Sequence, residues 1–430
     1  TMAKKNKYEI DMCNGTIMDK LISFSLPLML SGILQLMFNA VDIIVVGRFS
    51  GSQALAAVGS TSALINVFTN LFIGISLGAN VLTARFYAAG REKEVSETVH
   101  TAITLALVSG IVMALVGLVF SKGALALMGT PDDVIGLSAL YMRIYFLGMP
   151  FFMLYNYGAA ILRAVGDTKR PLLFLMIAGV INACLNMVLV IVFKLGVAGV
   201  AIATVISQMI SCVLVLRCLC RSESSYRLRF SELGMKGYYL KQIFSVGVPA
   251  GIQSTVINFS NVLLQSSVNS FGSTAMAGYT AANNLLGFLY VSVNSITQAC
   301  MSFTSQNYGV GKLKRMDRVL ADCMILSVVV AVVLGCICYG FGPEILQIYT
   351  EDAEVIACGM EILAYTTITY FLCGWMDLFP GALRGMGYSA VPMVLSVIGT
   401  VGTRVVWIFG IFPYHRSLAI LFISYPASWI

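Results

Sequence analysis

Residues 162–171, LRAVGDTKRP, and residues 383–392, LRGMGYSAVP, are two versions of one motif, 221 positions apart. Each begins with Leu-Arg, has glycine as its fifth residue and proline as its tenth, and lies between long apolar stretches. Further pairs at the same offset are Gly51-Ser52 with Gly272-Ser273, and Tyr87, Gly90 and Arg91 with Tyr308, Gly311 and Lys312. Because one constant offset relates separate motifs, the chain is predicted to consist of two related halves.

The sequence around these motifs is too apolar for an ordinary soluble domain. Of the 430 residues, 58% are hydrophobic and 11% are charged, whereas soluble chains carry about 25% charged residues. Apolar stretches long enough to cross a hydrocarbon core of about 30 Å recur along the chain. Within lipid such stretches satisfy their backbone groups as helices, and the alternating pattern of a membrane β-barrel does not occur in the sequence. We therefore expect an all-α membrane protein.

Twelve stretches are predicted to be transmembrane helices, six in each half, and the sequence is expected to end inside the last. Their approximate bounds are 21–46, 54–84, 96–120, 134–160, 170–193, 197–220, 238–268, 275–306, 317–340, 355–382, 389–412 and 418 onward. Since six is an even number, both halves enter the membrane from the same side. This predicts two six-helix lobes related by a pseudo-two-fold axis along the membrane normal, with a site between them.

The longest polar connection, residues 221–241, divides the two halves. The predicted domains are an N-lobe of residues 1–221, a cytoplasmic linker of residues 222–237, and a C-lobe of residues 238–430 with its last helix incomplete.

Basic residues lie mostly on one side of the predicted spans. Of the 27 Lys and Arg residues, 21 fall on the side of the N-terminus, 4 fall in loops on the other side, and Arg143 and Arg404 lie within spans. Because Lys and Arg concentrate in cytoplasmic loops, the N-terminus is predicted to be cytoplasmic. We expect a multi-pass protein of the plasma membrane, that is, the cell inner membrane. The excess of Lys and Arg in the predicted cytoplasmic segments explains the net charge of +7. Membrane lipid is therefore an expected partner, and nucleic acid is not.

The residue types that enzymes need are sparse. The eleven cysteines stand singly or as Cys-x-Cys within apolar runs, which is neither a zinc nor a redox spacing. The only histidines are His100 and His415, and no HExxH motif occurs. We therefore expect no enzyme, no catalytic residues and no cofactor.

Acidic residues inside spans are costly, so each one is a candidate functional site. Asp42 lies in the first span and Asp377 in the tenth. A carboxylate in such a place can exchange a proton for a metal ion, because burial disfavours its charge and a bound cation restores it. The alternatives stay open: Asp42 could lie near the outer headgroups, close to Arg48, and Asp377 could make a structural hydrogen bond.

Oxygen-bearing side chains in the fifth and sixth spans are candidates to accompany a carboxylate. Asn182 and Asn186 are four residues apart, so they share one helix face, and Thr204 lies in the next span. Amide, hydroxyl and carboxylate oxygens suit a small hard cation such as Na⁺. Interhelical hydrogen bonding explains the same residues equally well.

Prolines and aromatic residues complete the candidates. Pro27 and Pro249 occupy matching places in the two halves and are predicted hinges, since proline permits a helix to bend. Aromatic rings attract organic cations and methionines adapt to varied shapes, although packing or lipid contact explains any single one. The predicted substrate cavity comprises Gln35, Phe38, Asn39, Tyr141, Tyr145, Met149, Met153, Tyr279 and Asn283.

Three motifs resemble the multidrug and toxic compound extrusion (MATE) family, and the likeness runs over nearly the whole chain. The motifs are Pro27…Gln35…Asp42-Ile-Ile-Val-Val-Gly47, Ala54-Leu-Ala-Ala-Val-Gly59 and Leu162-Arg-Ala-Val-Gly-Asp-Thr-Lys169. The resemblance implies twelve helices in two lobes forming a V, a monomer, and drug efflux driven by Na⁺ or H⁺.

The resemblance also implies residue roles. The family's N-lobe cation site, including a metal site for Na⁺, falls on Asp42, Asn182, Asn186 and Thr204, and positions linked to bending and protonation fall on Pro27, Tyr141 and Asn156. This chain has Asn186 where the family often has Asp. Asp377 matches an acidic position in the C-lobe of another branch, whose glutamate partner in the seventh span is not evident here; Gln253 and Asn258 are the nearest polar residues.

We therefore expect a secondary active antiporter that exports cationic amphipathic drugs or metabolites in exchange for Na⁺ or H⁺ by alternating access. The alternative within the same superfamily is a flippase for lipid-linked oligosaccharides. Such flippases often have fourteen spans and a strongly cationic cavity, whereas this sequence has twelve spans and only Arg143 and Arg404 within them.

Overall fold

The computed structural model describes residues 6–430, and all regular elements in this range are helical. The first half contains α1 (Met18–Phe49), α2 (Ser52–Ala88), α3 (Glu92–Leu127), α4 (Asp132–Leu147), α5 (Met149–Ala164), α6 (Lys169–Asn186), the π-helix η1 (Met187–Val192) and α7 (Val197–Cys220). The second half contains the 3₁₀ turn η2 (Phe230–Glu232), α8 (Gly237–Asn269), α9 (Ser273–Gly309), α10 (Leu313–Gly340), α11 (Gly342–Leu346), α12 (Ala353–Thr366), α13 (Tyr370–Gly385), α14 (Ala390–Ser396), the π-helix η3 (Val397–Val401), α15 (Gly402–Val406), the π-helix η4 (Trp407–Ile411) and α16 (Leu418–Trp429). The all-α prediction is confirmed.

Many of these helices have the length and composition of membrane spans. Seven helical segments are long and apolar enough to cross a membrane, and two bent helix pairs raise the number to nine. α8 and α9 are also long, at 33 and 37 residues, but they carry more polar side chains, many of them buried within the bundle. Exposed apolar residues such as Leu115 and Val119 on α3 are explained by contact with lipid. The chain is a multi-pass membrane protein.

Two predicted spans are bent, although the sequence suggested continuous helices over 134–160 and 355–382. α4 and α5 meet at 48°, where Pro150, the second residue of α5, cannot donate a backbone hydrogen bond. α12 and α13 meet at 52°. There the hydroxyls of Thr366, Thr367 and Thr369 donate to backbone carbonyls four residues earlier, at 2.6–2.8 Å. Hydrogen bonds of this kind often bend helices.

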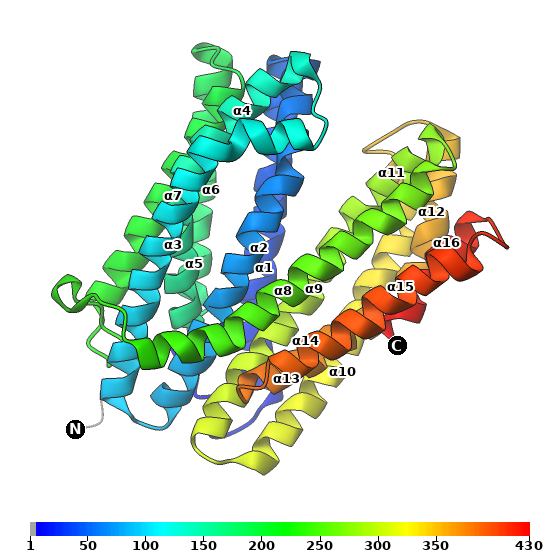
Figure 1. The fold of residues 1–430 in the computed structure, drawn as a ribbon. Coiled ribbons are helices and arrows are strands. Elements are labelled where there is room, and N and C mark those ends of the chain that lie inside the picture. The colour runs from blue at the N-terminus through cyan, green and yellow to red at the C-terminus, as the bar shows by residue number, and fades with distance from the viewer. Residues whose placement is uncertain (1–5) are drawn as a thin grey trace. The chain divides into compact units, whose positions relative to one another are not determined.

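The chain forms two compact units, each with its own hydrophobic core. The first unit comprises the described residues up to Asp11 and Ile33–Gly251, and the second comprises Met12–Gly32 and Ile252–Ile430. α3, α5 and α7 pack together in the first unit, and α9, α10 and α13 pack together in the second (Figure 1). α1 and α8 are each divided between the two units, so that part of each helix belongs to one unit and the rest to the other.

Glycines explain why the repeated motifs are alike. Gly166 and Gly387 have φ of 96° and 97°, and Gly51 and Gly272 have φ of 90° and 106°. These left-handed conformations are open to glycine and strained for other residues. Each motif therefore specifies the same turn between two helices in both halves.

The polar connection between α7 and α8 packs onto the first unit. The Tyr226 hydroxyl donates to Glu9 at 2.6 Å, and the Arg229 backbone N–H donates to His100 Nε2 at 3.0 Å. Burial, with the Glu9 hydrogen bond, raises the pKa of Tyr226 to about 12. Its hydroxyl therefore stays protonated and acts as a donor at neutral pH.

Candidate functional site

A close contact between α1 and α6 positions the candidate cation site. A Cβ added at Gly179 of α6 would collide with the ring of Phe38 on α1. Phe38 is one turn before Asp42, and Gly179 is three residues before Asn182, so this contact aligns the two polar segments. Glycine at position 179 is therefore required for α1 to approach α6 at this level of the helices.

The structure brings three of the predicted cation ligands together. Asn182 Nδ2 donates to Asp42 Oδ1 at 3.4 Å, and Asn186 Nδ2 donates to the same oxygen. Both asparagines are buried, and Asp42 is half-buried. The four-residue spacing of the asparagines therefore places two carboxamides against one carboxylate.

Each carboxamide also leaves an oxygen without a partner. The Oδ1 atoms of Asn182 and Asn186 are buried and accept no hydrogen bond from the part of the chain that the structure describes. Buried polar atoms are normally satisfied, so such orphans need an explanation. Two amide oxygens and a carboxylate form an oxygen-only donor set, which fits Na⁺ or a proton.

Thr204 and Asn156 make local hydrogen bonds instead of contacts with Asp42. The Thr204 hydroxyl on α7 donates to the Val200 carbonyl at 3.0 Å. Asn156 Nδ2 on α5 donates to the Phe152 carbonyl at 2.8 Å. Each side-chain oxygen retains lone pairs, so both residues stay candidates for coupling without a demonstrated contact to the carboxylate.

Two tyrosines of α4 lie near the carboxylate. The rings of Tyr141 and Tyr145 are 6.0 Å apart between centroids, and the charge of Asp42 acts on both hydroxyls. Tyr141 is buried and Tyr145 is half-buried. The predicted pair of aromatic residues is thus next to the predicted cation site.

The remaining predicted cavity residues differ in exposure. Gln35 and Asn39 of α1 are exposed, and Asn283 of α9 is half-buried. Met149 and Met153 are fully buried in the core of the first unit. Their placement is that of packing residues.

Tyr279 is buried in the core of the second unit. Its hydroxyl shares a hydrogen bond of 2.6 Å with the hydroxyl of Tyr425. The ring is therefore held by packing and by this bond.

Asp377 of α13 has charged and polar neighbours of its own. Tyr290 and Arg384 both act electrostatically on its carboxyl group. Arg384 donates in turn to Gln253 of α8, the residue considered as a polar partner in the seventh span. Asp377 therefore has a resident cation nearby, whereas Asp42 has none among the neighbours that act on it.

Arg404 is a buried cation that the sequence placed in a span without assigning a role. It is 2% exposed, donates to Ser260, Asn261 and Ser428 at 2.6–3.1 Å, and has no carboxylate within 4.0 Å among residues 6–430. The repeat offset of 221 relates position 404 to position 183, between the two site asparagines. The constant offset between the halves could therefore have identified Arg404 as the counterpart of the segment that holds the two site asparagines.

Comparison with known proteins agrees with this architecture. The family model MatE matches the chain twice, over residues 27–188 and 249–409, one match in each half. The "Probable multidrug resistance protein YoeA" of Bacillus subtilis (strain 168) is 32% identical over 94% of this chain and 89% of its own length. The "Multidrug export protein MepA" of Staphylococcus aureus (strain NCTC 8325 / PS 47) is 22% identical over 88% and 84%.

Solved structures share the fold. A MATE protein crystallised in complex with MaL6 superposes with a TM-score of 0.91 at 20% identity, over 99% of this chain and 95% of that one. The outward-facing structure of "a multidrug resistance MATE family transporter of the MOP superfamily" gives a TM-score of 0.90 at 19% identity, with the same coverage. With two matches to the family model and relatives that match along most of its length, this chain belongs to the MATE (MatE) family.

Proposed function

We propose that this protein is a secondary active antiporter that exports cationic amphipathic drugs or metabolites in exchange for Na⁺ or H⁺. Relatives named as multidrug resistance and multidrug export proteins support drug export. The observation that carries ion coupling is a carboxylate on a membrane helix, Asp42, held by two buried carboxamides. The oxygens of these carboxamides lack hydrogen-bond partners among residues 6–430. Ionisable groups inside membrane spans are functional by default.

The geometry supports a simple exchange of donors and acceptors. With Asp42 ionised, Asn182 and Asn186 donate N–H groups to it. A half-turn of either carboxamide would replace a donor by an acceptor oxygen. That oxygen could ligate Na⁺ beside the carboxylate or accept a hydrogen bond from protonated Asp42. Either cation would neutralise the site, while its departure would restore the described arrangement.

Asp42 is the better candidate for coupling than Asp377. The second carboxyl group has Arg384 as a nearby cation, so a transported cation would compete with a resident one. The region of the second unit that corresponds to the Asn182–Asn186 segment holds Arg404, which would repel a further cation. We therefore place the exchange of Na⁺ or H⁺ in the first unit.

Substrate recognition is proposed near the same carboxylate. Gln35 and Asn39 are exposed on α1, within two turns of Asp42, and the α4 tyrosines supply aromatic faces that attract organic cations. A drug cation and a coupling cation would then compete for one negative charge. Such competition is what antiport by alternating access requires.

The proposed orientation places the N-terminus in the cytoplasm. The strong bias of Lys and Arg toward that side supports it. With this orientation in a plasma membrane, the exporter would act as a monomer that moves its substrate outward.

The test is transport of a fluorescent cationic dye in proteoliposomes under an imposed Na⁺ gradient or an imposed pH gradient. Wild type, Asp42→Asn and Asp377→Asn are compared, and dye binding is measured in parallel. We expect one gradient to drive transport in the wild type, Asp42→Asn to abolish it, and Asp377→Asn to retain most of it.

The outcomes separate the parts of the proposal. The gradient that drives transport identifies the ion. Loss of transport only in Asp377→Asn would indicate that ion coupling depends on the second unit and not on Asp42. No dye movement under either gradient, with binding intact, would refute drug export and direct attention to lipid-linked substrates.

A further inference from the structure

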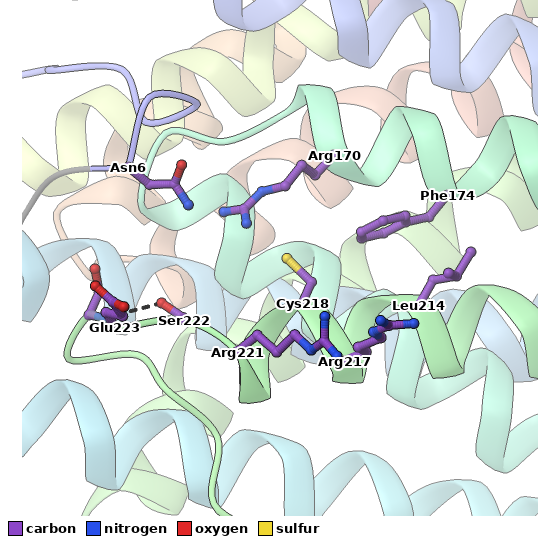
Figure 2. Close-up of a pocket in the computed structure, with 10 residues that line it drawn as sticks. Asn6, Arg170, Phe174, Leu214, Arg217, Cys218, Arg221, Ser222 and Glu223 are labelled. Atoms are coloured by element: carbon purple, nitrogen blue, oxygen red, sulfur yellow. Dashed lines mark hydrogen bonds between the residues drawn. The ribbon is translucent and has the colours of Figure 1, made fainter.

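A basic cavity of about 620 Å³ lies at the start of α6 and the end of α7, within the first unit. Figure 2 shows Arg170 of α6 on one wall, Arg217 and Arg221 of α7 on the opposite wall, and Cys218 between them. Glu223, in the connection after α7, also lines the cavity. Three guanidinium groups therefore surround one space with a single carboxylate among its lining residues.

These guanidinium groups have donors to spare. Arg170 pairs with Asp167, but its Nη2 has no hydrogen-bond partner in the described part of the chain. Arg217 and Arg221 are exposed, and neither has a carboxylate within 4.0 Å among residues 6–430. Planar guanidinium forks match phosphate oxygens well. The cavity is thus prepared for a phosphate-bearing group.

The apolar surroundings distinguish a lipid from a free anion. Phe174 and Leu214 line the cavity one turn further into the helices. At the same level, Leu173 and Val213 are 51% and 58% exposed, which fits contact with acyl chains. A basic pocket at the ends of membrane helices, continued by an apolar surface, has the chemistry that recognises anionic lipid headgroups.

We propose that this cavity binds the phosphate headgroup of an anionic phospholipid, with its acyl chains lying along α6 and α7. A bound headgroup would join Arg170 of α6 to Arg217 and Arg221 of α7. These two helices also carry Asn182 and Thr204, so the lipid would brace the helices of the proposed ion site from one end. The binding itself depends only on the membrane location of the chain and not on ion coupling.

The test measures lipid binding to the purified protein by native mass spectrometry. Phosphatidylglycerol is the probe, phosphatidylcholine is the zwitterionic comparison, and inorganic phosphate is the competitor. We expect phosphatidylglycerol to bind more tightly than phosphatidylcholine and to resist displacement by inorganic phosphate. Because a cation at a membrane surface strengthens binding of anionic lipid about fivefold, the double variant Arg217→Gln/Arg221→Gln should weaken it about 30-fold.

Two further variants keep the test independent of misfolding. Lys241→Gln/Lys314→Gln removes the same charge from two exposed positions outside the cavity and should leave binding unchanged. Glu223→Gln removes the one carboxylate that lines the cavity and should tighten binding severalfold. Asp42→Asn should not alter lipid binding, which separates this proposal from the antiport proposal.

Three results would overturn the proposal. Equal binding of the two phospholipids would show that the charge of the headgroup does not determine binding. Equal weakening in the lysine control would indicate general attraction by positive charge. Inorganic phosphate that binds as tightly as phosphatidylglycerol would show a site for free anions.

Discussion

Asp42 and Arg404 show how single residues give the related halves different electrostatics. Asp42 is a carboxylate supported by two amide donors, and the amide oxygens beside it have no partner within the described part of the chain. Arg404 is a guanidinium whose bonds to Ser260, Asn261 and Ser428 hold a permanent positive charge. The first arrangement can accept a cation and the second already contains one. Duplication of the helices therefore need not duplicate the proposed coupling site.

Replacing Asn186 by Asp should make the proposed site dependent on a cation. The new carboxylate cannot donate to Asp42 unless it is protonated, and two buried like charges repel. Without Na⁺, we expect a melting temperature several degrees below that of the wild type, falling further as the pH rises and the shared proton is lost. Na⁺ at 100 times its Kd would raise the free energy of unfolding of this variant by about 2.7 kcal/mol.

The measurement is thermal unfolding of Asn186→Asp in NaCl and in choline chloride over a range of pH. Asn284→Asp adds the same charge at an exposed position of α9 and serves as the control. A melting temperature of Asn186→Asp that does not respond to Na⁺ or pH would contradict a cation site at Asp42.

At the scale of elements, the contact between α1 and α6 decides whether the polar residues meet. Asn182 and Asn186 share a face through helical spacing alone, and this could be predicted from the sequence. Their pairing with Asp42, 140 and 144 positions away, needs two helices to approach closely. Gly179 permits this because the Phe38 ring occupies the space of its missing side chain.

Gly179→Ala should destabilise the protein by overpacking this contact, at a cost of about 1–3 kcal/mol. Gly123→Ala in α3 is the matched control, since no heavy atom lies within 4 Å of the added Cβ. Alanine there should stabilise the helix by about 0.5–1 kcal/mol. Thermal unfolding of both variants checks the sign of each change.

A second substitution tests the mechanism of the first. Phe38→Leu removes part of the ring that obstructs the Cβ, so the double variant should cost less than the sum of the single variants. Strict additivity would show that the ring does not restrict position 179.

The same scale explains what sequence reasoning could reach and what it could not. Apolar length and the repeated glycine turns predicted the all-α membrane fold, because both are local properties. The bends in the α4–α5 and α12–α13 pairs were missed, although Pro150 and a threonine cluster near residue 367 cause them. The hydrogen bonds of Arg404 depend on three distant positions, so a sequence could reveal the charge but not its partners.

At the scale of the whole molecule, two of the passages of the chain between its units lie inside continuous helices. These two transitions fall at Gly32–Ile33 in α1 and at Gly251–Ile252 in α8, and a third falls at Asp11–Met12, before α1 begins. Pro27 and Pro249 lie within these helices, shortly before the transitions. Proline lacks a backbone donor and lowers the cost of bending there. Two helices that join the units thus carry the predicted hinges at matching places.

Pro27→Ala and Pro249→Ala should slow transport while leaving dye binding nearly unchanged. Alanine restores a backbone hydrogen bond and favours the straight helix by about 3 kcal/mol. If transport by alternating access needs either helix to bend, even half of that energy would reduce the rate about tenfold. Pro343→Ala is the control, because Pro343 lies in the first turn of α11, where proline costs a helix little.

The decisive comparison is the initial rate of dye transport in proteoliposomes against the Kd for dye in detergent. Reduced rates at unchanged Kd in both hinge variants, with the Pro343 control unaffected, would place the conformational step in α1 and α8. An effect of Pro27→Ala alone would restrict bending to the helix that carries Asp42, and thereby tie it to the proposed cation site. Unchanged rates in both variants would show that neither proline acts as a hinge in transport.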